Sequence, residues 1–264
     1  MNYLSATTIV KNEKHYIKEW LAYYKSMGVE QFYIFDNGST DGTEDEVYDL
    51  PFSDDINFID FKLNKTDKIA SAYNFAVEYF KSKTEWMIFC DPDEFFIPQA
   101  VDDLRKFLED YEEFSGVGAN WRTYGSSGHI LRPVSGLCVE NFLNRGKDDW
   151  CVNLHVKSIV KPSEVIGYLN PHVFNTLKGT ADENGELIKG ETPGRLEAVN
   201  GSKIRVNQYF TRAYEDYLEK YRASDKTSSN FKERADIDWF DAYDINEVYD
   251  DTAKQYAEQI RQNL

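Results

Sequence analysis

The stretch Trp86–Phe96 reads WMIFCDPDEFF, and it joins a short apolar run to a group of carboxylates. A run such as Met87–Cys90, bounded by polar residues, is typical of a buried strand. Asp91 and Asp93 then flank Pro92 where that strand would leave the sheet. Ligands of open α/β sheets bind at the carboxyl ends of strands. Two carboxylates at this spacing can share Mg²⁺ or Mn²⁺ with phosphate oxygens, and a solvated acidic turn is the plain alternative.

The chain before this stretch alternates between strand-like and helix-like patterns. Strands are expected at Leu4–Val10, Gln31–Phe35, Ile56–Phe61 and Trp86–Asp91. Apolar residues at three- and four-residue steps predict helices at Tyr16–Met27 and Lys68–Phe80, with another ending near Leu50. This alternation predicts an α/β fold with a mostly parallel sheet, right-handed crossovers and helices on both faces.

The loops after the first, second and fourth strands should meet at one edge of that sheet. The polar residues on this edge are Asn12, Glu13, Asp36, Asn37, Ser39, Asp41, Asp91 and Asp93. Their convergence is the main physical argument for a binding site, although Asp36 and Asp41 are also residue types that cap helices and turns.

The second part of the chain has weaker patterns. Helices are expected at Val101–Tyr111, Tyr214–Tyr221 and Asn246–Gln262, and extended segments at Gly116–Trp121, Val152–Val160 and Lys203–Phe210. Thr176–Asn200 is polar and glycine-rich, which favours a mobile surface excursion that could serve as a lid. No linker divides the chain, so residues 1–264 are expected to form a single domain.

The composition excludes several classes of partner. Lys and Arg number 30 against 46 Asp and Glu, a net charge of −16, which argues against nucleic acids and anionic membranes. Three cysteines without a C-x-x-C pattern fit a reducing compartment. We see no signal peptide and no apolar run long enough to span a bilayer. A cytoplasmic protein, with at most peripheral contact at the inner face of the membrane, is expected.

Several segments together resemble a known family. They are TTIVKNEKHYIKEWLAYYKSMGVEQFYIFDNGSTDGT (7–43), DKIASAYNFAVEYFKSKTEWMIFCDPDEFFIP (67–98), NWRTYGSSGH (120–129), HVKSIVKP (155–162), NPHVF (170–174) and VNQYFTRAYEDYLEK (206–220). The chain is similar, from Ser5 to Arg222, to glycosyltransferases of the family 2 and family 92 group. The resemblance implies a GT-A fold, a nucleotide-sugar donor and Mn²⁺ or Mg²⁺. It also implies a nucleotide-sugar-binding half (1–100), an acceptor-side half (101–222) and a C-terminal helical extension (223–264).

The resemblance also assigns roles to residues, by position. As metal ligands it implies Asp91, Asp93, His155 and His172. As donor-binding residues it implies Asn12, Glu13, Asp36, Lys68, Asn74, Arg122 and Lys157. One departure is Asn207-Gln208-Tyr209, where similar chains often read N-H-Y. If that histidine holds the metal in relatives, Gln208 is a weaker ligand, and His155 or His172 would have to serve.

The implied reaction is transfer of a sugar, with inversion, to a hydroxyl of a glycan or lipid-linked glycan. The departing diphosphate needs a cation, helped by Lys157 or Arg122, and the acceptor needs a base. Glu140, Asp149 and Glu94 are the candidate bases, and Glu94 could instead brace the turn after the strand. A UDP-linked donor rests on the D-x-D analogy, and synthesis of a surface polysaccharide or lipopolysaccharide would fit.

Two other functions compete with this hypothesis. A noncatalytic nucleotide-sugar-binding module is supported by Gln208 alone. A D-x-D phosphohydrolase would use a nucleophilic aspartate, but it leaves the later motifs unexplained.

Overall fold

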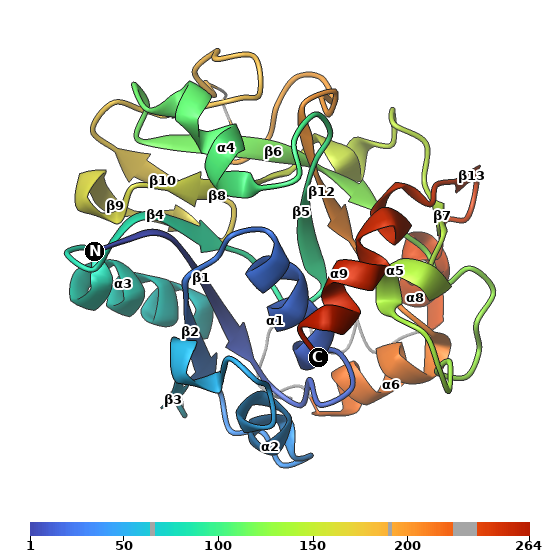
Figure 1. The fold of residues 1–264 in the computed structure, drawn as a ribbon. Helices are drawn as coiled ribbons and strands as arrows, with labels where there is room; N and C mark the ends of the chain where they lie inside the picture. Colours follow the sequence, from blue (N-terminus) through green and yellow to red (C-terminus); the bar gives the residue numbers. More distant parts are fainter. Residues whose placement is uncertain (64–66, 190–191, 224–236) are drawn as a thin grey trace.

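A computed structural model describes residues 1–63, 67–189, 192–223 and 237–264 (Figure 1). Its first elements are β1 (Asn2–Val10), α1 (Ile17–Ser26), β2 (Gln31–Asp36), α2 (Thr43–Tyr48), β3 (Ile56–Asp60), α3 (Lys68–Phe80), β4 (Thr84–Phe89) and β5 (Glu94–Pro98). The middle elements are α4 (Leu104–Leu108), β6 (Gly116–Thr123), α5 (Cys138–Asn141), β7 (Asn144–Arg145), β8 (Val156–Val160), β9 (Val165–Asn170), β10 (Val173–Thr176) and β11 (Thr180–Ala181). The last are β12 (Ile204–Gln208), α6 (Tyr214–Ala223), α8 (Ile237–Tyr243), β13 (Val248–Tyr249) and α9 (Ala257–Gln262).

The main sheet has the strand order β3-β2-β1-β4-β8-β6-β12-β5, with β11 paired to β6. Pairing is parallel from β3 through β4, and β6 is parallel to β11 and β12. β8 is antiparallel to both of its neighbours, and β5 is antiparallel to β12. The predicted α/β class with a mostly parallel sheet is therefore confirmed, and the carboxyl ends of β1, β2 and β4 share one edge.

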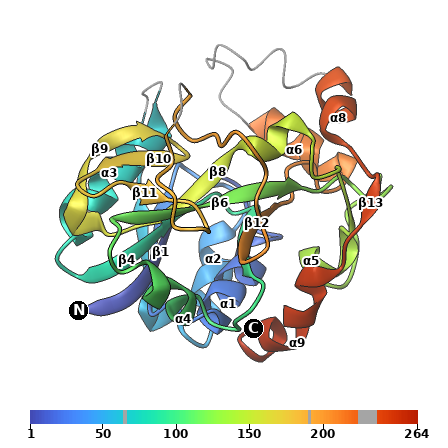
Figure 2. The same cartoon turned by 90° about the horizontal axis from the view of Figure 1, so that it is seen from above.

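Alternate residues of the central strands pack into two different cores, because successive side chains of a strand point to opposite faces. In β2, Phe32 and Ile34 belong to the larger core, whereas Tyr33 and Phe35 belong to the smaller one. Figure 2 shows α1, α4 and α9 on the side of the larger core, and α3 with the β9–β10 hairpin on the other.

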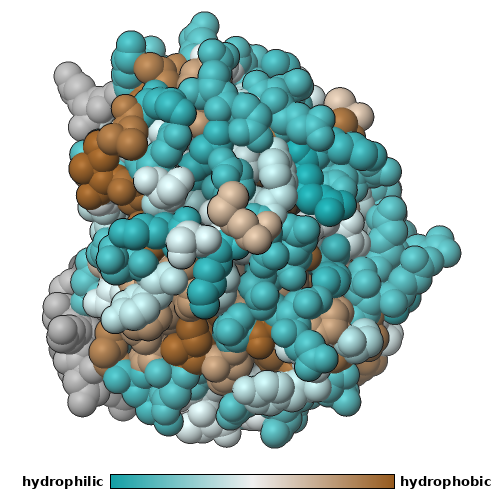
Figure 3. All heavy atoms as spheres, turned by 60° about the vertical axis from the view of Figure 1, so that its left-hand side comes forward, coloured by the Kyte–Doolittle hydropathy of each residue, from teal (hydrophilic) through white to brown (hydrophobic). Residues whose placement is uncertain are grey.

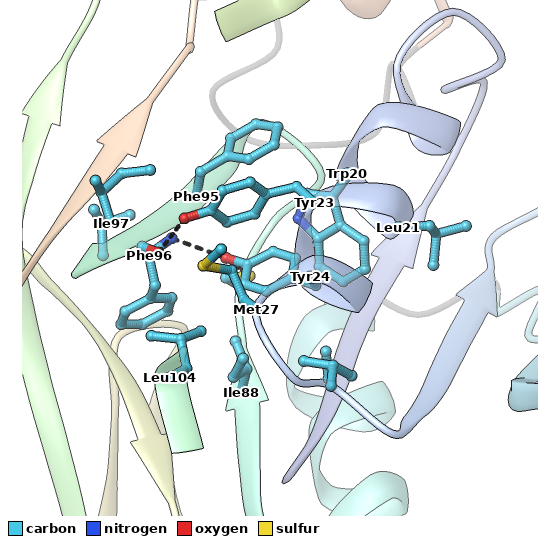
Figure 4. Close-up of a cluster of buried hydrophobic side chains, with 14 of the residues drawn as sticks. Trp20, Leu21, Tyr23, Tyr24, Met27, Ile88, Phe95, Phe96, Ile97 and Leu104 are labelled. Atoms are coloured by element: carbon cyan, nitrogen blue, oxygen red, sulfur yellow. Dashed lines mark hydrogen bonds between the residues drawn. The ribbon is translucent and has the colours of Figure 1, made fainter. Parts of the chain in front are cut away.

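Aromatic residues of α1 fix the strand that follows the D-x-D (Figure 4). The Tyr23 hydroxyl donates to the Phe96 carbonyl at 2.6 Å, and the Phe96 amide donates to the Tyr24 hydroxyl at 3.1 Å. Trp20 Nε1 lies 3.1 Å from the carbonyl oxygens of both Asp91 and Glu94. These side chains are fully buried, so α1 holds both sides of the acidic turn by hydrogen bonds shielded from water.

The predicted helix Asn246–Gln262 is wrong in its first half. Val248–Tyr249 forms β13 against β7, a 3-10 turn covers Thr252–Tyr256, and only α9 is α-helical. The cause is Asp250, whose carboxylate accepts from Arg145 at 2.6 Å and from Arg205 at 2.8 Å. This buried ion-pair network ties the segment to the sheet, so residues 248–256 are not part of a helical extension.

The prediction that Thr176–Asn200 forms a surface excursion is wrong for residues 180–183, which are buried. β11 pairs with β6, and the Glu183 carboxylate accepts the backbone N–H groups of Gly201, Ser202, Lys203 and Ile204 at 2.9–3.1 Å. One acid thus satisfies the backbone that leads into β12, and this part of the segment is not a free lid.

The face that bears α3 and the β9–β10 hairpin is mostly hydrophilic, with separate apolar patches (Figure 3). On β9, Ile166 and Leu169 are among the exposed apolar side chains. Across the part of the chain that the structure describes, no helix has both the length and the apolar character needed to cross a bilayer.

Glu19 gives a stability prediction for the fold. Its buried carboxylate accepts the Cys138 amide at 2.6 Å and the Val139 amide at 3.1 Å. Burial raises the pKa of Glu19 to about 7, although the hydrogen bonds from the two backbone amides act to lower it. The folded state therefore favours the protonated form of Glu19. We expect the free energy of unfolding to fall as pH rises from about 5 to 8, by up to about 3 kcal/mol from this group.

Urea unfolding across that pH range measures the slope. Glu19→Gln should reduce it, whereas Glu78→Gln, which removes an exposed partner of Lys81, should leave it unchanged. A slope that is identical in Glu19→Gln and the parent would assign the pH dependence to other groups.

Candidate active site

The D-x-D lies in a tight connection between β4 and β5. Glu94, which begins β5, donates its amide to the Asp91 carbonyl at 3.0 Å, and its Oε2 accepts the Asp91 amide at 2.8 Å. The Glu94 side chain is fully buried and supports the turn from inside. Of its two predicted roles, catalytic base and support of the turn, this geometry corresponds to the second. β5 was not predicted from the sequence. Only a few polar positions separate its apolar residues from those of β4, so the sequence does not mark a second strand there.

Lys157 of β8 lies beneath the first aspartate. Its Nζ is 3.0 Å from Asp91 Oδ2 and 3.1 Å from Glu94 Oε2, and its side chain is 1% exposed. Burial raises the pKa of Glu94 to about 8, with a further rise from Asp91 and an opposing effect from Lys157. Although burial alone would lower it, Asp91 and Glu94 hold the pKa of Lys157 well above its ordinary range. One buried cation therefore faces two buried acids, and Glu94 is the acid whose pKa burial raises.

Two cations from the far end of the chain complete the turn. Lys220 of α6 donates to Asp93 Oδ2 at 2.6 Å. Arg212 donates to Glu13 Oε2 at 2.7 Å and to the Pro92 carbonyl at 3.0 Å. Neither cation was predicted as a site residue, because a periodic pattern cannot tell which charges meet across 127 or 199 positions.

Arg212 is held in an unusual backbone conformation, with φ of 49°. Non-glycine residues seldom adopt this left-handed region, so surrounding contacts must hold it there. Its guanidinium stacks 3.9 Å from the centroid of the Tyr16 ring, in addition to the bonds to Glu13 and Pro92. The segment after β12 is thus anchored to the loops after β1 and β4.

The loops after β1 and β2 meet as predicted, through hydrogen bonds among themselves. Asp36 accepts the amides of Gly38 and Ser39 at 3.1 Å, and Asn12 Oδ1 accepts the Thr40 amide at 2.8 Å. Asp36 and Asn12 therefore shape the loops, and neither is among the residues that line the pocket over the D-x-D, described next.

A pocket with a volume of about 470 Å³ opens over the D-x-D. Its residues come from β1 and the loop after it, from the loop after β4, from β6, β8, β12 and the segment after β12, from the turn between β9 and β10, and from the helices α3, α6 and α8. They are Ile9, Lys11, Glu13, Ile69, Asp91, Pro92, Asp93, Trp121, Lys157, Pro171, His172, Gln208, Phe210, Lys220, Tyr221, Trp239 and Tyr243. Acids and cations gather at the centre, with aromatic rings on the side of α6 and α8.

The two histidines of the expected metal set pack against each other and against Trp121, and of the two only His172 lines the pocket with the aspartates. The rings of His155 and His172 are 5.1 Å apart, and Trp121 lies at 5.2 Å and 5.1 Å from them. Burial, then Lys157, lowers the pKa of His172 to about 4, so it is neutral at pH 7. Its Nδ1 faces the Val156 carbonyl at 2.8 Å, which assigns the proton to Nδ1 and leaves Nε2 as an acceptor.

The side chains around the D-x-D suit a divalent cation that also binds a ligand. Among residues 1–63, 67–189, 192–223 and 237–264, no three His, Cys, Asp or Glu side chains are grouped so as to hold a metal by themselves. Mg²⁺-type sites commonly use one or two carboxylates and complete their shell with water and substrate phosphates. Asp91 and Asp93 fit that second kind of site, in which the metal arrives with a phosphorylated ligand.

Other predicted residues lie outside the pocket. Glu140 pairs with Arg261 at 2.5 Å and caps the Leu137 amide at 2.9 Å, and Asp149 is exposed. Arg122 pairs with Asp148 at 2.9 Å and donates to the Asn200 carbonyl at 3.0 Å. The remaining ones are on α3, where Lys68 is half-buried and Asn74 lines a separate groove against β9.

Fold and pocket together define one class of protein, an α/β domain with a charged pocket at the carboxyl ends of its strands. The chain matches the model of glycosyltransferase family 92 over residues 5–256, and it belongs to that family. The predicted membership of family 92 is thereby confirmed.

Two curated plant relatives carry the family name. A family 92 protein of Oryza sativa subsp. japonica is 23% identical over 267 residues, which cover 96% of this chain and 44% of the relative. One of Arabidopsis thaliana is 25% identical over 232 residues, with 83% and 37% covered. The chain therefore spans less than half the length of these relatives.

Solved structures give weaker likenesses. TarS 1-349 of S. aureus in complex with UDP has a TM-score of 0.41 at 15% identity, covering 61% of this chain and 47% of that one. Glucosyl-3-phosphoglycerate synthase of Mycobacterium tuberculosis with Mn²⁺, UDP-glucose and phosphoglyceric acid has a TM-score of 0.32 at 16% identity, covering 46% and 44%. At these TM-scores the likeness carries no argument about the site.

Proposed function

We propose that this domain transfers a sugar from a nucleotide-sugar donor to an acceptor hydroxyl. The observation that supports it is the pocket over Asp91 and Asp93, at the carboxyl ends of β1 and β4, in a chain of family 92. Nucleotides bind at such strand ends in open α/β sheets. We expect a UDP-linked donor on the side of Ile9, Lys11 and Ile69, with its diphosphate over the D-x-D.

The chemistry follows from the charges at the centre of the pocket. Mn²⁺ or Mg²⁺ on Asp91 and Asp93 would neutralise charge on the departing diphosphate. Lys157 sets the position of Asp91, and Arg212 sets that of the Pro92 carbonyl. The acceptor hydroxyl gives its proton to a basic group or a water in the pocket as its oxygen attacks the anomeric carbon. The diphosphate leaves from the opposite side with the bonding electrons, so the configuration inverts.

The acceptor would lie on the other side of the D-x-D. Phe210, Tyr221, Trp239 and Tyr243 line that side, and the rings of Trp239 and Tyr243 stack at 4.8 Å. Aromatic walls with a few polar groups suit the apolar faces of sugar rings. We propose a glycan or a lipid-linked glycan as the acceptor; the surface-polysaccharide pathway and the cytoplasmic location stay predictions from the sequence.

The noncatalytic alternative keeps one supporting observation. Gln208, which occupies the position of the histidine in N-H-Y, lines the pocket and accepts from the Thr123 hydroxyl at 3.2 Å. Such a module would bind the donor but show no transfer to any acceptor.

Thermal unfolding with UDP-, GDP- and CDP-sugars, each with and without Mn²⁺, tests the proposal. A ligand that binds only the native state raises the melting temperature by mass action. We expect a rise of about 5–10 °C with a UDP-sugar and Mn²⁺, at about 100 times the Kd. The absence of any shift across the panel, with the protein folded, would contradict nucleotide-sugar binding.

A further inference from the structure

The two aspartates of the D-x-D have lysine partners of different character. Lys157 is fully buried between Asp91 and Glu94, and it has no room to leave. Lys220 reaches Asp93 from α6 and is 38% exposed, while Asp93 itself is 4% exposed. Lys220 also lines the pocket, so its ammonium lies where a ligand over the D-x-D would arrive.

We propose that Lys220 pairs with Asp93 in the free protein and transfers to the diphosphate of the donor when the donor binds. In the free state it competes with a cation for Asp93. In the bound state it contributes positive charge to the leaving group. This inference rests on the proposed function, because it needs a diphosphate in this pocket.

Charge supplies the reason for the exchange. A divalent cation on Asp93 would repel an ammonium 2.6 Å from the same oxygen, whereas a diphosphate brings several negative oxygens to the pocket. Lysine suits this movement, since its ammonium is a point charge on a flexible stem with three donors. The Phe210 ring, 5.5 Å from Nζ, lies beside Lys220 and keeps the ammonium near the pocket.

The helix that carries Lys220 is fixed, so the movement is confined to the side chain. The Asp216 carboxylate accepts from the Tyr16 hydroxyl and from Arg132, each at 2.5 Å. Arg212 stays on Glu13 and Pro92, and it preserves the turn when Lys220 leaves. Of the two cations that reach the turn from the segment after β12, Arg212 holds its shape and Lys220 exchanges partners.

Lys220→Met tests the exchange with two binding measurements. Mn²⁺ alone, followed by electron paramagnetic resonance, should bind several-fold more tightly than to the parent, because Asp93 is released. UDP at saturating Mn²⁺, followed by calorimetry, should bind about tenfold more weakly, because a charged donor is lost. Lys220→Arg should keep most of the UDP affinity.

The matched control is Lys178→Met, which breaks a 2.7 Å ion pair with Glu164 away from the pocket, and it should change neither affinity. If Lys220 only holds α6 in place, Lys220→Met will weaken both ligands and lower the melting temperature, and the exchange is overturned. Equal UDP affinity in parent and Lys220→Met overturns this inference alone. Failure of the parent to bind either UDP or inorganic pyrophosphate overturns the proposed function with it.

Discussion

Asp93→Asn is expected to weaken Mn²⁺-dependent binding of the nucleotide-sugar by about 10- to 100-fold and to leave the fold intact. Asparagine keeps the shape of the side chain but removes the anionic oxygen that a hard cation prefers. This loss of binding free energy corresponds to one contact of a charged group that is partly shielded from water. Calorimetry with UDP, with and without Mn²⁺, measures it, and circular dichroism reports the fold.

The dependence on metal separates this prediction from a general weakening. Without Mn²⁺ the variant should bind UDP at least as tightly as the parent, because the loss of the Asp93 charge releases Lys220. Asp49→Asn is the matched control, since it removes an exposed carboxylate that pairs with Lys18 at 2.6 Å. Unchanged donor affinity in Asp93→Asn would remove Asp93 from the metal site.

Arg212→Ala should lower the free energy of unfolding by about 3–5 kcal/mol. Arg212 and Glu13 are 7% and 8% exposed, so the substitution leaves a buried carboxylate without its partner. It also removes the donor to the Pro92 carbonyl, which disturbs the D-x-D turn. Urea unfolding of both proteins at pH 7 gives the difference directly.

Lys18→Ala is the control for the effect of burial, because it breaks ion pairs of a side chain that is 27% exposed. It should lower the free energy of unfolding by less than about 1 kcal/mol. Glu13→Gln combined with Arg212→Met should cost less than the two single changes added together, because no lone charge remains buried. A loss below about 1 kcal/mol for Arg212→Ala would show that water reaches Glu13 and solvates it.

The first part of the fold could be predicted because periodicity and burial coincide there. Lys68–Phe80 is α3 from end to end, and the strand that precedes the D-x-D ends at Phe89 within two residues of its expected end. Gly28, expected to end the first helix, has φ of 90°, a conformation that glycine adopts without strain. Local sequence alone decides such features.

The site was predictable only in outline. Asp91, Asp93, Glu13 and Lys157 line the pocket, but the sequence could not show that Lys220 and Arg212 would complete it. Long-range ion pairs depend on the arrangement of the strands, which no single segment encodes. The base candidates Glu140 and Asp149 failed to reach the pocket for the same reason, since their distance from the D-x-D is a property of the whole sheet.

The strand order also bears on how this domain could be recombined with its relatives. β5 belongs to the first hundred residues, yet its hydrogen-bond partner in the main sheet is β12, from residues 204–208. A chimera joined near residue 100 would pair a β5 from one parent with a β12 from another, directly behind the acidic turn. Exchange of acceptor specificity between relatives therefore requires a joint that moves both strands together, and the two halves of the sequence are not interchangeable modules.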